Sequence, residues 1–213
     1  DKAILDTGSF ELLVVSKQCR QCLDAPYDSK TSTTFRPGPN ASEIIPHEFG
    51  SGPTESLKGY EYIKIGKISA KNQTFFQIVG HKIKAMNQSD SFNAIVGIGP
   101  PSPNAIEESL LTGLGVSKFS LCLQRSPLAP GWFTWGGGLT AFQKKQSLEL
   151  RVIGKRHWAV SMRHFMPNIQ MSPEQRKAAG TLLCERGCAA VLDSGTSLIS
   201  APSHALKGLE LLL

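Results

Sequence analysis

Two short acidic motifs in this sequence share one pattern and could do chemistry together. The first is Ile4–Ser9, with the sequence ILDTGS, and the second is Val191–Thr196, with the sequence VLDSGT. Each has two apolar residues, an aspartate, a hydroxyl residue, a glycine and a second hydroxyl residue. One such motif is weak evidence for an active site, because Asp-Thr-Gly occurs by chance in many loops. Two copies with matching flanks are strong evidence, because a duplicated lobe can bring both loops together on a pseudo-two-fold axis.

Paired aspartates suit the hydrolysis of a peptide bond without a metal ion or a covalent intermediate. One carboxylate takes a proton from water, and a second, protonated carboxyl donates a proton to the carbonyl oxygen. Two carboxyls in close contact cannot both ionise, so such a pair shares one proton. The sequence therefore predicts that Asp6 and Asp193 form a catalytic pair.

The residues around each aspartate are expected to hold the two carboxyls coplanar. Glycine lets the two turns approach closely, because it has no side chain. Hydroxyl groups can hydrogen-bond across the axis between the two motifs. The expected supporting residues are Thr7, Gly8, Ser9, Ser194, Gly195 and Thr196.

The elements that must position these motifs are mostly strands, which favours an all-β fold. Apolar or alternating patterns typical of strands occur at 3–5, 12–15, 60–65, 75–79 and 94–98. The polar, glycine-containing segment 50–59 is predicted to be a hairpin tip. Helical patterns are confined to 105–112 and to the residues after Pro202, and the polar segment 166–179 is expected to be a surface loop.

Composition and charge exclude several classes of protein. The chain has 213 residues, 40% of them hydrophobic and 19% charged, which is typical of a globular protein. The net charge of +6 comes from scattered basic residues, so no nucleic-acid partner is expected. No apolar run approaches the roughly 20 residues that cross a bilayer, so no membrane segment is expected.

The cysteines and three glycosylation sequons favour a secretory compartment and a glycoprotein. The sequons begin at Asn40, Asn72 and Asn87. A zinc site would need four ligands, and no histidine pair lies at the usual spacing, so no metal is expected. We favour two small disulfide loops, one between Cys19 and Cys22 and one between Cys184 and Cys188, with a buried free thiol at Cys122.

The paired motifs resemble the two active-site signatures of the pepsin-like aspartic endopeptidases of eukaryotes. Phe49–Gly52 matches the tip of the family's flap, and Ala94–Gly99 matches the apolar strand that crosses under the first aspartate. Phe119–Leu121 resembles a core strand of the family and Trp135–Gly138 a turn, and the two cysteine pairs lie where the family has small disulfide loops. The resemblance covers nearly the whole chain.

This resemblance implies a bilobal fold with a pseudo-two-fold axis, and cleavage of polypeptides with apolar residues around the cut. It implies no cofactor, a monomer, and secretion or a lysosome-like or vacuole-like compartment. We place a first lobe at 1–148, without its first strand, and the beginning of a second lobe at 149–213, with both ends of the chain cut. The residues expected to bind substrate are Ile4, Phe49, Gly50, Ser51, Phe92 and Ile95.

Some departures from the family pattern leave a second hypothesis open. The family usually has Tyr where this chain has Phe49, and Trp where it has Leu13. The second lobe lacks the matching apolar strand. The alternative is a pepsin-fold peptide-binding protein that no longer cleaves, or a truncated fragment, and Phe49 could be an ordinary apolar hairpin residue. The histidines are expected to be surface or structural residues: His47, His81, His157, His164 and His204.

Overall fold

Strands predominate in the structure, a computed structural model that describes residues 2–88, 92–126, 129–137, 147–163, 172–174, 184 and 187–203. The first strands are β1 (Ala3–Asp6), β2 (Leu12–Val15), β3 (Arg36–Pro37), β4 (Ile44–Phe49), β5 (Gly52–Ile65), β6 (Ile68–His81) and β7 (Ala94–Gly97). The later strands are β8 (Phe119–Cys122), β9 (Trp132–Trp135), β10 (Ala159–Met162) and β11 (Cys188–Val191). The helical segments are the short η1 (Lys84–Asn87), η2 (Ile106–Glu108) and α1 (Leu110–Gly113). The all-β prediction is therefore confirmed.

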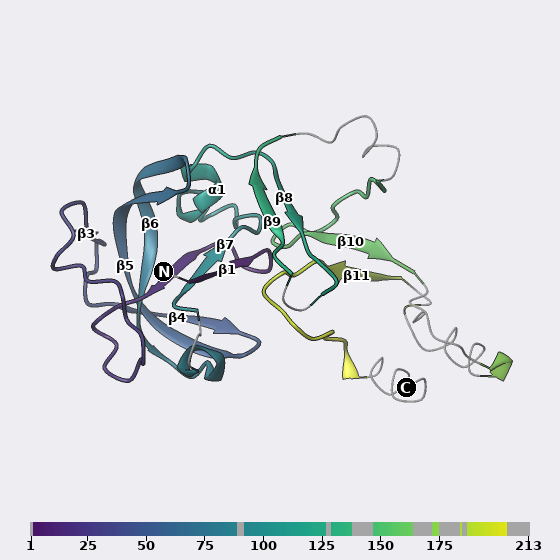
Figure 1. Cartoon of the computed structure of the whole chain (residues 1–213), viewed down its shortest axis with the longest axis horizontal. Coiled ribbons are helices and arrows are strands. Elements are labelled where there is room, and N and C mark those ends of the chain that lie inside the picture. Colours follow the sequence, from purple (N-terminus) through teal and green to yellow (C-terminus); the bar gives the residue numbers. More distant parts are fainter. Residues whose placement is uncertain are drawn as a thin grey trace.

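The first seven strands form one sheet that carries the first acidic motif. Its order is β1-β7-β2-β6-β5-β3, and β4 pairs with β5. Strand β1 lies parallel to β7, and β2 lies antiparallel to β7, so β7 is held between the two strands that flank the motif. Figure 1 shows this sheet on the left of the molecule, with the two later hairpins on the right.

The central strands β2, β6 and β7 are buried on both faces of this sheet, and adjacent residues of a strand point to opposite sides. Leu13, Phe76 and Ile95 belong to one core cluster. Their neighbours Leu12, Phe75 and Val96 belong to another. The continuous apolar runs at 12–15, 75–79 and 94–98 therefore fill two cores from one sheet.

The flap hairpin is longer than the sequence suggested. Phe49 pairs with Gly52, so only Gly50 and Ser51 lie beyond the ladder, and the prediction of a tip at 50–59 was wrong. Residues 52–59 belong to β5, where the inward positions include Thr54 (1% exposed) and Ser56 (0% exposed). Because small polar residues occupy these buried positions, the period of two is hidden in the sequence.

Two further expectations need correction. The helical pattern at 105–112 forms η2 and α1 rather than one helix, because Ser109 is extended and its side chain caps α1 by accepting from the Thr112 amide. Cys122 is a free thiol, as predicted, but it is exposed. In β8 the burial alternates, so Cys122 lies on the face opposite to Phe119 and Leu121.

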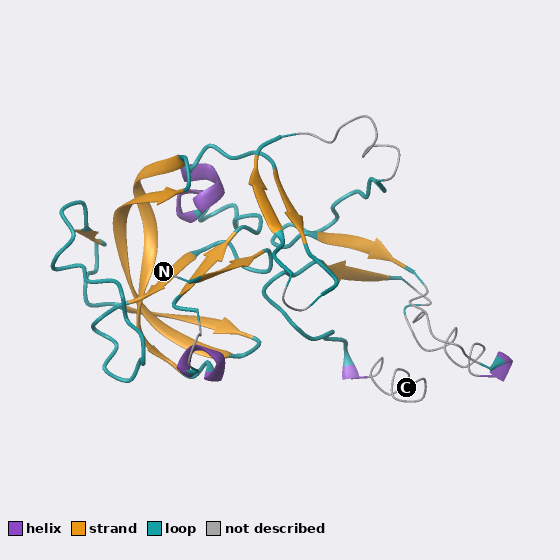
Figure 2. Cartoon of the chain, viewed as in Figure 1, coloured by secondary structure: helices purple, strands orange, loops and turns teal. Residues whose placement is uncertain are grey.

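The second acidic motif follows an antiparallel pair of strands. Ala159 of β10 pairs with Val191 of β11, and the Leu192 amide donates to the carbonyl of Trp158 at 3.0 Å. The Trp158 indole N–H in turn donates to the Ile98 carbonyl at 2.9 Å, just after β7. The end of β11 is thus tied to the sheet that carries the first motif, and Figure 2 shows the two hairpins beside that sheet.

Several predictions concern residues with little or no description in the structure. Between 136 and 154, the described residues include Val152, which forms an isolated β-bridge with Val160. The helix predicted after Pro202, and all of 166–179 except 172–174, lie outside the described residues. The lobe boundary near residue 148 stays a prediction. No helix in the described ranges is both long and apolar enough to span a membrane.

Candidate active site

Reciprocal hydrogen bonds join the turns that follow β1 and β11. The Thr7 amide donates to Ser194 Oγ at 3.1 Å, and the Ser194 amide donates to Thr7 Oγ1 at 2.8 Å. The two hydroxyls continue across the axis: Thr7 Oγ1 donates to the Leu192 carbonyl at 2.7 Å, and Ser194 Oγ donates to the Leu5 carbonyl at 2.6 Å. These four bonds have the two-fold pattern expected of duplicated turns, and they bring Asp6 and Asp193 together.

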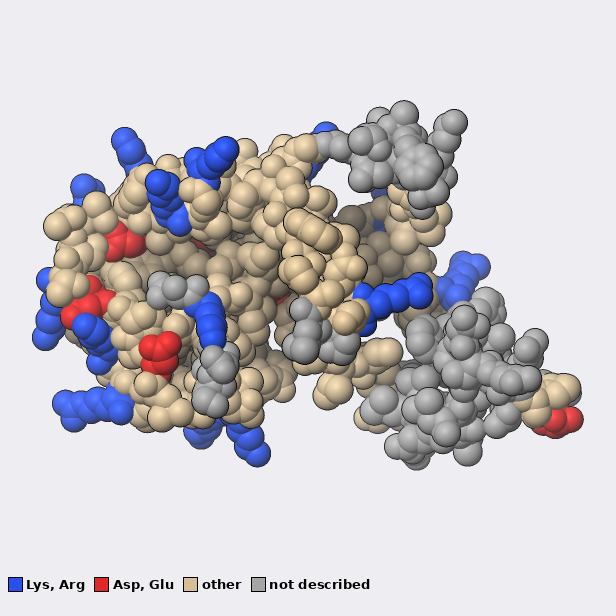
Figure 3. Space-filling view, viewed as in Figure 1, with Lys and Arg blue, Asp and Glu red and all other residues tan. Residues whose placement is uncertain are grey.

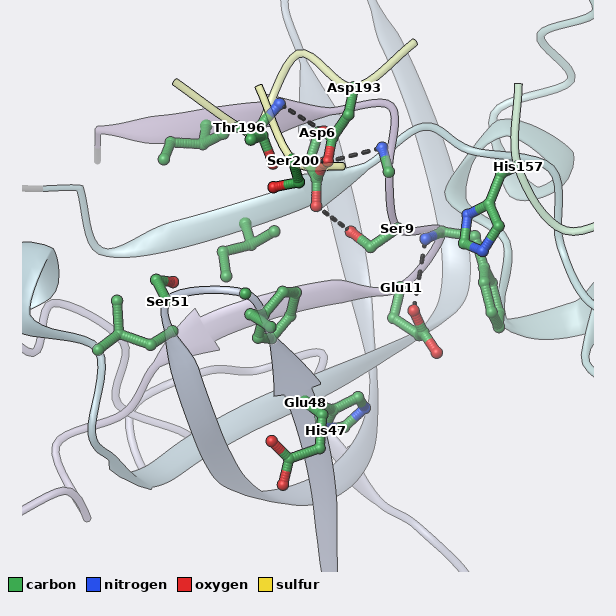
Figure 4. A pocket seen from close by; sticks show the side chains of 18 of the residues that line it. Asp6, Ser9, Glu11, His47, Glu48, Ser51, His157, Asp193, Thr196 and Ser200 are labelled. Carbon is green, nitrogen blue, oxygen red and sulfur yellow. Dashed lines mark hydrogen bonds between the residues drawn. The ribbon is translucent and has the colours of Figure 1, made fainter. Parts of the chain in front are cut away.

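The other two hydroxyls have a different part from the predicted one. Ser9 Oγ donates to Asp6 Oδ2 at 2.5 Å, and Thr196 Oγ1 donates to Asp193 Oδ2 at 2.7 Å. Each therefore orients the aspartate of its own motif and does not cross the axis. Figure 4 shows the Ser9 hydroxyl directed at the Asp6 carboxyl.

The two glycines lie directly against the opposite carboxyl. A Cβ at Gly8 would lie 2.6 Å from Asp193 Oδ2, and a Cβ at Gly195 would lie 2.7 Å from Asp6 Cγ. The amide of Gly8 donates to Asp6 Oδ1 at 2.9 Å, and that of Gly195 donates to Asp193 Oδ1 at 2.8 Å. Glycine is needed here because the carboxyls occupy the space of a side chain.

Burial and hydrogen bonding shift the pKa values of the two aspartates in opposite directions. Asp6 is 7% exposed, and this burial raises its pKa, with the hydrogen bond and the charge of Asp193 acting in the same direction. Burial also raises the pKa of Asp193, but the hydrogen bonds from Thr196 and the Gly195 amide outweigh it, so that the pKa is lowered. The pair therefore favours one shared proton, held mainly by Asp6.

The bonds across the axis predict a loss of stability on Thr7→Val. This change keeps the shape but leaves the Ser194 amide and the Leu192 carbonyl without their partner. We expect the free energy of unfolding to fall by about 1–3 kcal/mol, because two partly buried hydrogen bonds of about 0.5–1.5 kcal/mol each are lost. Thr7→Ser, which keeps the hydroxyl, should lose clearly less in urea unfolding. Equal midpoints for the wild type and Thr7→Val would contradict the role of these bonds.

A cleft of about 710 Å³ contains both aspartates and lies beneath the flap formed by β4 and β5. All six residues predicted to contact substrate line it: Ile4, Phe49, Gly50, Ser51, Phe92 and Ile95. Phe49 and Phe92 also pack against the core cluster that contains Leu13. The flap therefore rests on apolar packing, consistent with the loss of the family's usual Tyr and Trp. That these residues bind substrate remains a prediction.

The cleft also contains ionisable residues that the sequence analysis did not single out. They are Glu11, His47, Glu48, Arg156 and His157. His47 and His157, which we expected to be surface or structural residues, thus also line the cleft. Alternation along the flap strand could have identified His47, since Phe49 lies two residues further on. No comparable pattern marked the others.

His47 nonetheless has a structural contact as well. Its Nδ1 lies 3.2 Å from Ser56 Oγ, and its ring meets Phe76 edge to face with centroids 4.7 Å apart. Burial lowers the pKa of His47, so the neutral ring is favoured against the apolar core. This histidine fixes the flap strand to the sheet while one side of it faces the cleft.

One group of possible metal ligands occurs in the described part of the chain. The ligand atoms of Cys19, Cys22 and His81 lie within 4.8 Å of one another. Cys19 and Cys22 are joined by a disulfide, as are Cys184 and Cys188, so the first pair offers no thiolates to a metal.

On the face shown in Figure 3, Lys and Arg side chains are spread around the edge rather than gathered in one patch.

The sheet topology, the flap and the paired Asp-hydroxyl-Gly turns define a pepsin-like aspartic protease fold. The chain matches the family described as eukaryotic aspartyl protease over residues 2–210, and it belongs to this family.

The chain is also similar to several curated proteins. The chain is 28% identical to an aspartic proteinase of Oryza sativa subsp. japonica, with 94% of this chain and 40% of that protein covered. It is 27% identical to Napsin-A of Homo sapiens, covering 96% of this chain and 49% of the relative. It is 27% identical to cathepsin D of Gallus gallus, covering 97% of this chain and 52% of the relative. The chain thus spans about half the length of the curated relatives it matches.

Proposed function

We propose that the protein is an aspartic endopeptidase that hydrolyses polypeptides with a water molecule activated between Asp6 and Asp193. The observation that carries this proposal is the interlocked pair of turns, in which Thr7 and Ser194 exchange hydrogen bonds across the axis. Membership of the eukaryotic aspartyl protease family supports it. No cofactor or metal takes part in the proposed reaction.

The two carboxyls have complementary parts in this reaction. Asp193, with its lowered pKa, takes a proton from water, while Asp6 gives its proton to the carbonyl oxygen of the scissile bond. The resulting tetrahedral diol collapses when Asp193 passes its proton to the leaving nitrogen and a diol hydroxyl returns a proton to Asp6. The carbon–nitrogen bond breaks, and both carboxyls regain their starting states. Aspartic proteases are the established example of such a shared proton.

The shape of the cleft supports an extended peptide as substrate. The flap residues Phe49 and Ser51 and the opposite residues Ile4 and Ile95 all line it, so that a strand-like segment can lie between them. The apolar members favour apolar side chains near the cut. We propose that the protein acts as a monomer, with lobes at 1–148 and 149–213.

The compartment is part of the same proposal. Asn40, Asn72 and Asn87 are all exposed, as attachment of a sugar requires. Two disulfides are compatible with an oxidising environment. We place the protein in the secretory pathway, as a secreted glycoprotein or in a lysosome-like or vacuole-like compartment.

The direct test is cleavage of an unfolded protein at mildly acidic pH by the complete polypeptide encoded by the gene. A peptide analogue with a hydroxyl in place of the scissile carbonyl should inhibit by mimicking the tetrahedral diol. Cleavage that the analogue suppresses supports the endopeptidase. Cleavage that it leaves unchanged, or none at all, would contradict it.

A second candidate function is peptide binding without cleavage. Phe49 and Leu13 favour it, because the family's usual hydrogen-bonding pair at these positions is replaced by apolar packing. Peptides would then bind the cleft at acidic pH and be recovered intact. Calorimetry combined with chromatography of the recovered peptide distinguishes the two candidates.

The electrostatics of the pair predict a bell-shaped pH profile on the acid side. Catalysis requires Asp193 ionised and Asp6 protonated, so activity rises with pH through the lowered pKa and falls through the raised one. The two apparent values belong to the coupled pair. The dependence of kcat/KM on pH should therefore show two limbs below neutrality. A profile that rises through neutral pH to a plateau would rule out the pair as the catalytic groups.

A further inference from the structure

A third carboxyl, that of Glu11, lines the cleft beside the pair and has no part in the proposed reaction. It belongs to the connection between β1 and β2. Figure 4 shows Glu11 between Ser9 and His47, on the His157 side of Asp6, whereas Ser51 lies on the other side. A charged residue at this place meets whatever part of a substrate extends past the dyad in that direction.

The backbone of Glu11 is held in register with that of Asp6. The Gly97 amide donates to the Glu11 carbonyl at 2.9 Å, and the next amide, that of Ile98, donates to the Asp6 carbonyl at 2.8 Å. A Cβ at Gly97 would lie 2.6 Å from the Glu11 nitrogen, so the two chains are packed backbone to backbone. The backbones of Asp6 and Glu11 are therefore anchored to the last residue of β7 and the residue after it, which fixes their spacing.

The Glu11 carboxyl lacks a cationic partner among the described residues. Its described side-chain hydrogen bond comes from the Phe10 amide, at 3.4 Å. Burial raises the pKa of Glu11, hydrogen bonds from its own amide and the Phe10 amide oppose this rise in part, and the negative charges of Glu108 and Asp6 add to it. Lys58 is already paired with Glu108 at 2.7 Å. A half-buried carboxylate of this kind gains most from a cation brought by a ligand.

We propose that Glu11 forms a subsite for a positively charged side chain, Lys or Arg, of a peptide bound next to the scissile bond. This inference rests on the proposed endopeptidase function and specifies its substrates further. The ammonium or guanidinium group would donate to the Glu11 carboxylate inside the cleft, where the partial exclusion of water strengthens the bond. Glu48 on the flap, Arg156 and His157 line the same cleft, and no ion pair of Glu11 with either of the last two occurs among the described residues.

The subsite should lose its preference as the pH falls. Because the pKa of Glu11 is raised, the residue becomes neutral at a higher pH than an exposed glutamate does. A neutral carboxyl offers a basic side chain no charge. Selection for Lys should therefore increase with pH within the working range of the enzyme, which gives a second readout independent of the overall rate.

The test compares peptides that differ at one position, Lys, norleucine or Glu, scanned through the residues flanking the cut, with the complete polypeptide as enzyme. At one position the wild type should prefer Lys over norleucine by about tenfold in kcat/KM, the usual scale of a charge-assisted hydrogen bond. Glu11→Gln should reduce this ratio to about one and remove its dependence on pH. Glu11→Lys should favour the Glu peptide.

Glu107→Gln is the matched control, because Glu107 is exposed on η2 and outside the residues that line the cleft. It should keep the wild-type ratio. If Glu11→Gln cleaves the Lys peptide with the wild-type preference, the inference is wrong while the endopeptidase stands. If no peptide is cleaved at all, the proposed function fails, and the ratio of dissociation constants for the Lys and norleucine peptides still decides whether Glu11 selects a cation.

Discussion

Asp6→Asn is expected to reduce kcat by about 10³-fold or more while peptide binding remains. The amide keeps the size of the carboxyl; its oxygen can still accept from the Gly8 amide and its NH2 group can donate to the Ser9 hydroxyl, so the turn should persist. It cannot release a proton to the carbonyl oxygen or share one with Asp193. Loss of general acid catalysis costs about 10²–10⁴-fold, and here the shared proton is lost as well.

The pair should behave as one unit in a double-mutant cycle. Asp193→Asn alone should be about as inactive as Asp6→Asn, and the double variant little worse, because residues that act together are not additive. Asp28→Asn is the control, since Asp28 pairs with Lys17 outside the cleft. The test is to measure turnover and peptide dissociation constants for the wild type, the two single variants, the double variant and the control. Substantial cleavage by either single variant would show that the two motifs are only structural.

The proximity of Asp6 and Asp193 could be predicted because its signal is local and repeated. Each motif has two apolar residues before the aspartate and a glycine two residues after it, and in the structure β1 ends at Asp6 and β11 ends at Val191. The hydrogen-bond partners of the individual hydroxyl groups could not be predicted in the same way. Thr7 crosses the axis whereas Ser9 bonds Asp6, and this difference depends on the direction of each side chain within the turn.

The misplaced features share one physical cause, which is that burial depends on neighbours distant in the sequence. Thr54 and Ser56 are buried in β5, which pairs with both β4 and β6. Because both residues are polar, the sequence does not indicate that they are buried. Cys122 lies between two leucines, yet among the described strands β8 pairs with β9 alone, and the side of β8 that carries Cys122 is exposed.

Cleft residues are the hardest to predict for the same reason. His157 lies far along the chain from the flap and reaches the cleft because β10 pairs with β11 beside the first sheet. Glu11 is near Asp6 in sequence, but its place in the cleft follows from its contact with Gly97, a contact between different strands. The spacing of residues in the sequence does not by itself indicate such contacts.

Gly195→Ala is expected to inactivate the enzyme with little effect on its fold. The new methyl group would lie 2.7 Å from Asp6 Cγ, so either the Asp6 carboxyl or the second turn must move. Either movement separates the two carboxyls and weakens the hydrogen bond from Ser9 or the bonds that hold Asp193. Because misplacement by about 1 Å can cost 10²-fold, we expect kcat to fall by at least about that factor.

Three measurements separate this effect from unfolding. Gly195 is exposed, so the urea midpoint should stay close to that of the wild type. Gly80→Ala is the matched control, because its methyl group would lie 3.0 Å from Glu55 Oε2, the movable end of a long side chain. With the carboxyls apart, their mutual effect on pKa weakens, so the two limbs of any residual activity should move closer together. A Gly195→Ala variant with wild-type turnover would show that the carboxyls do not need the contact that this glycine permits.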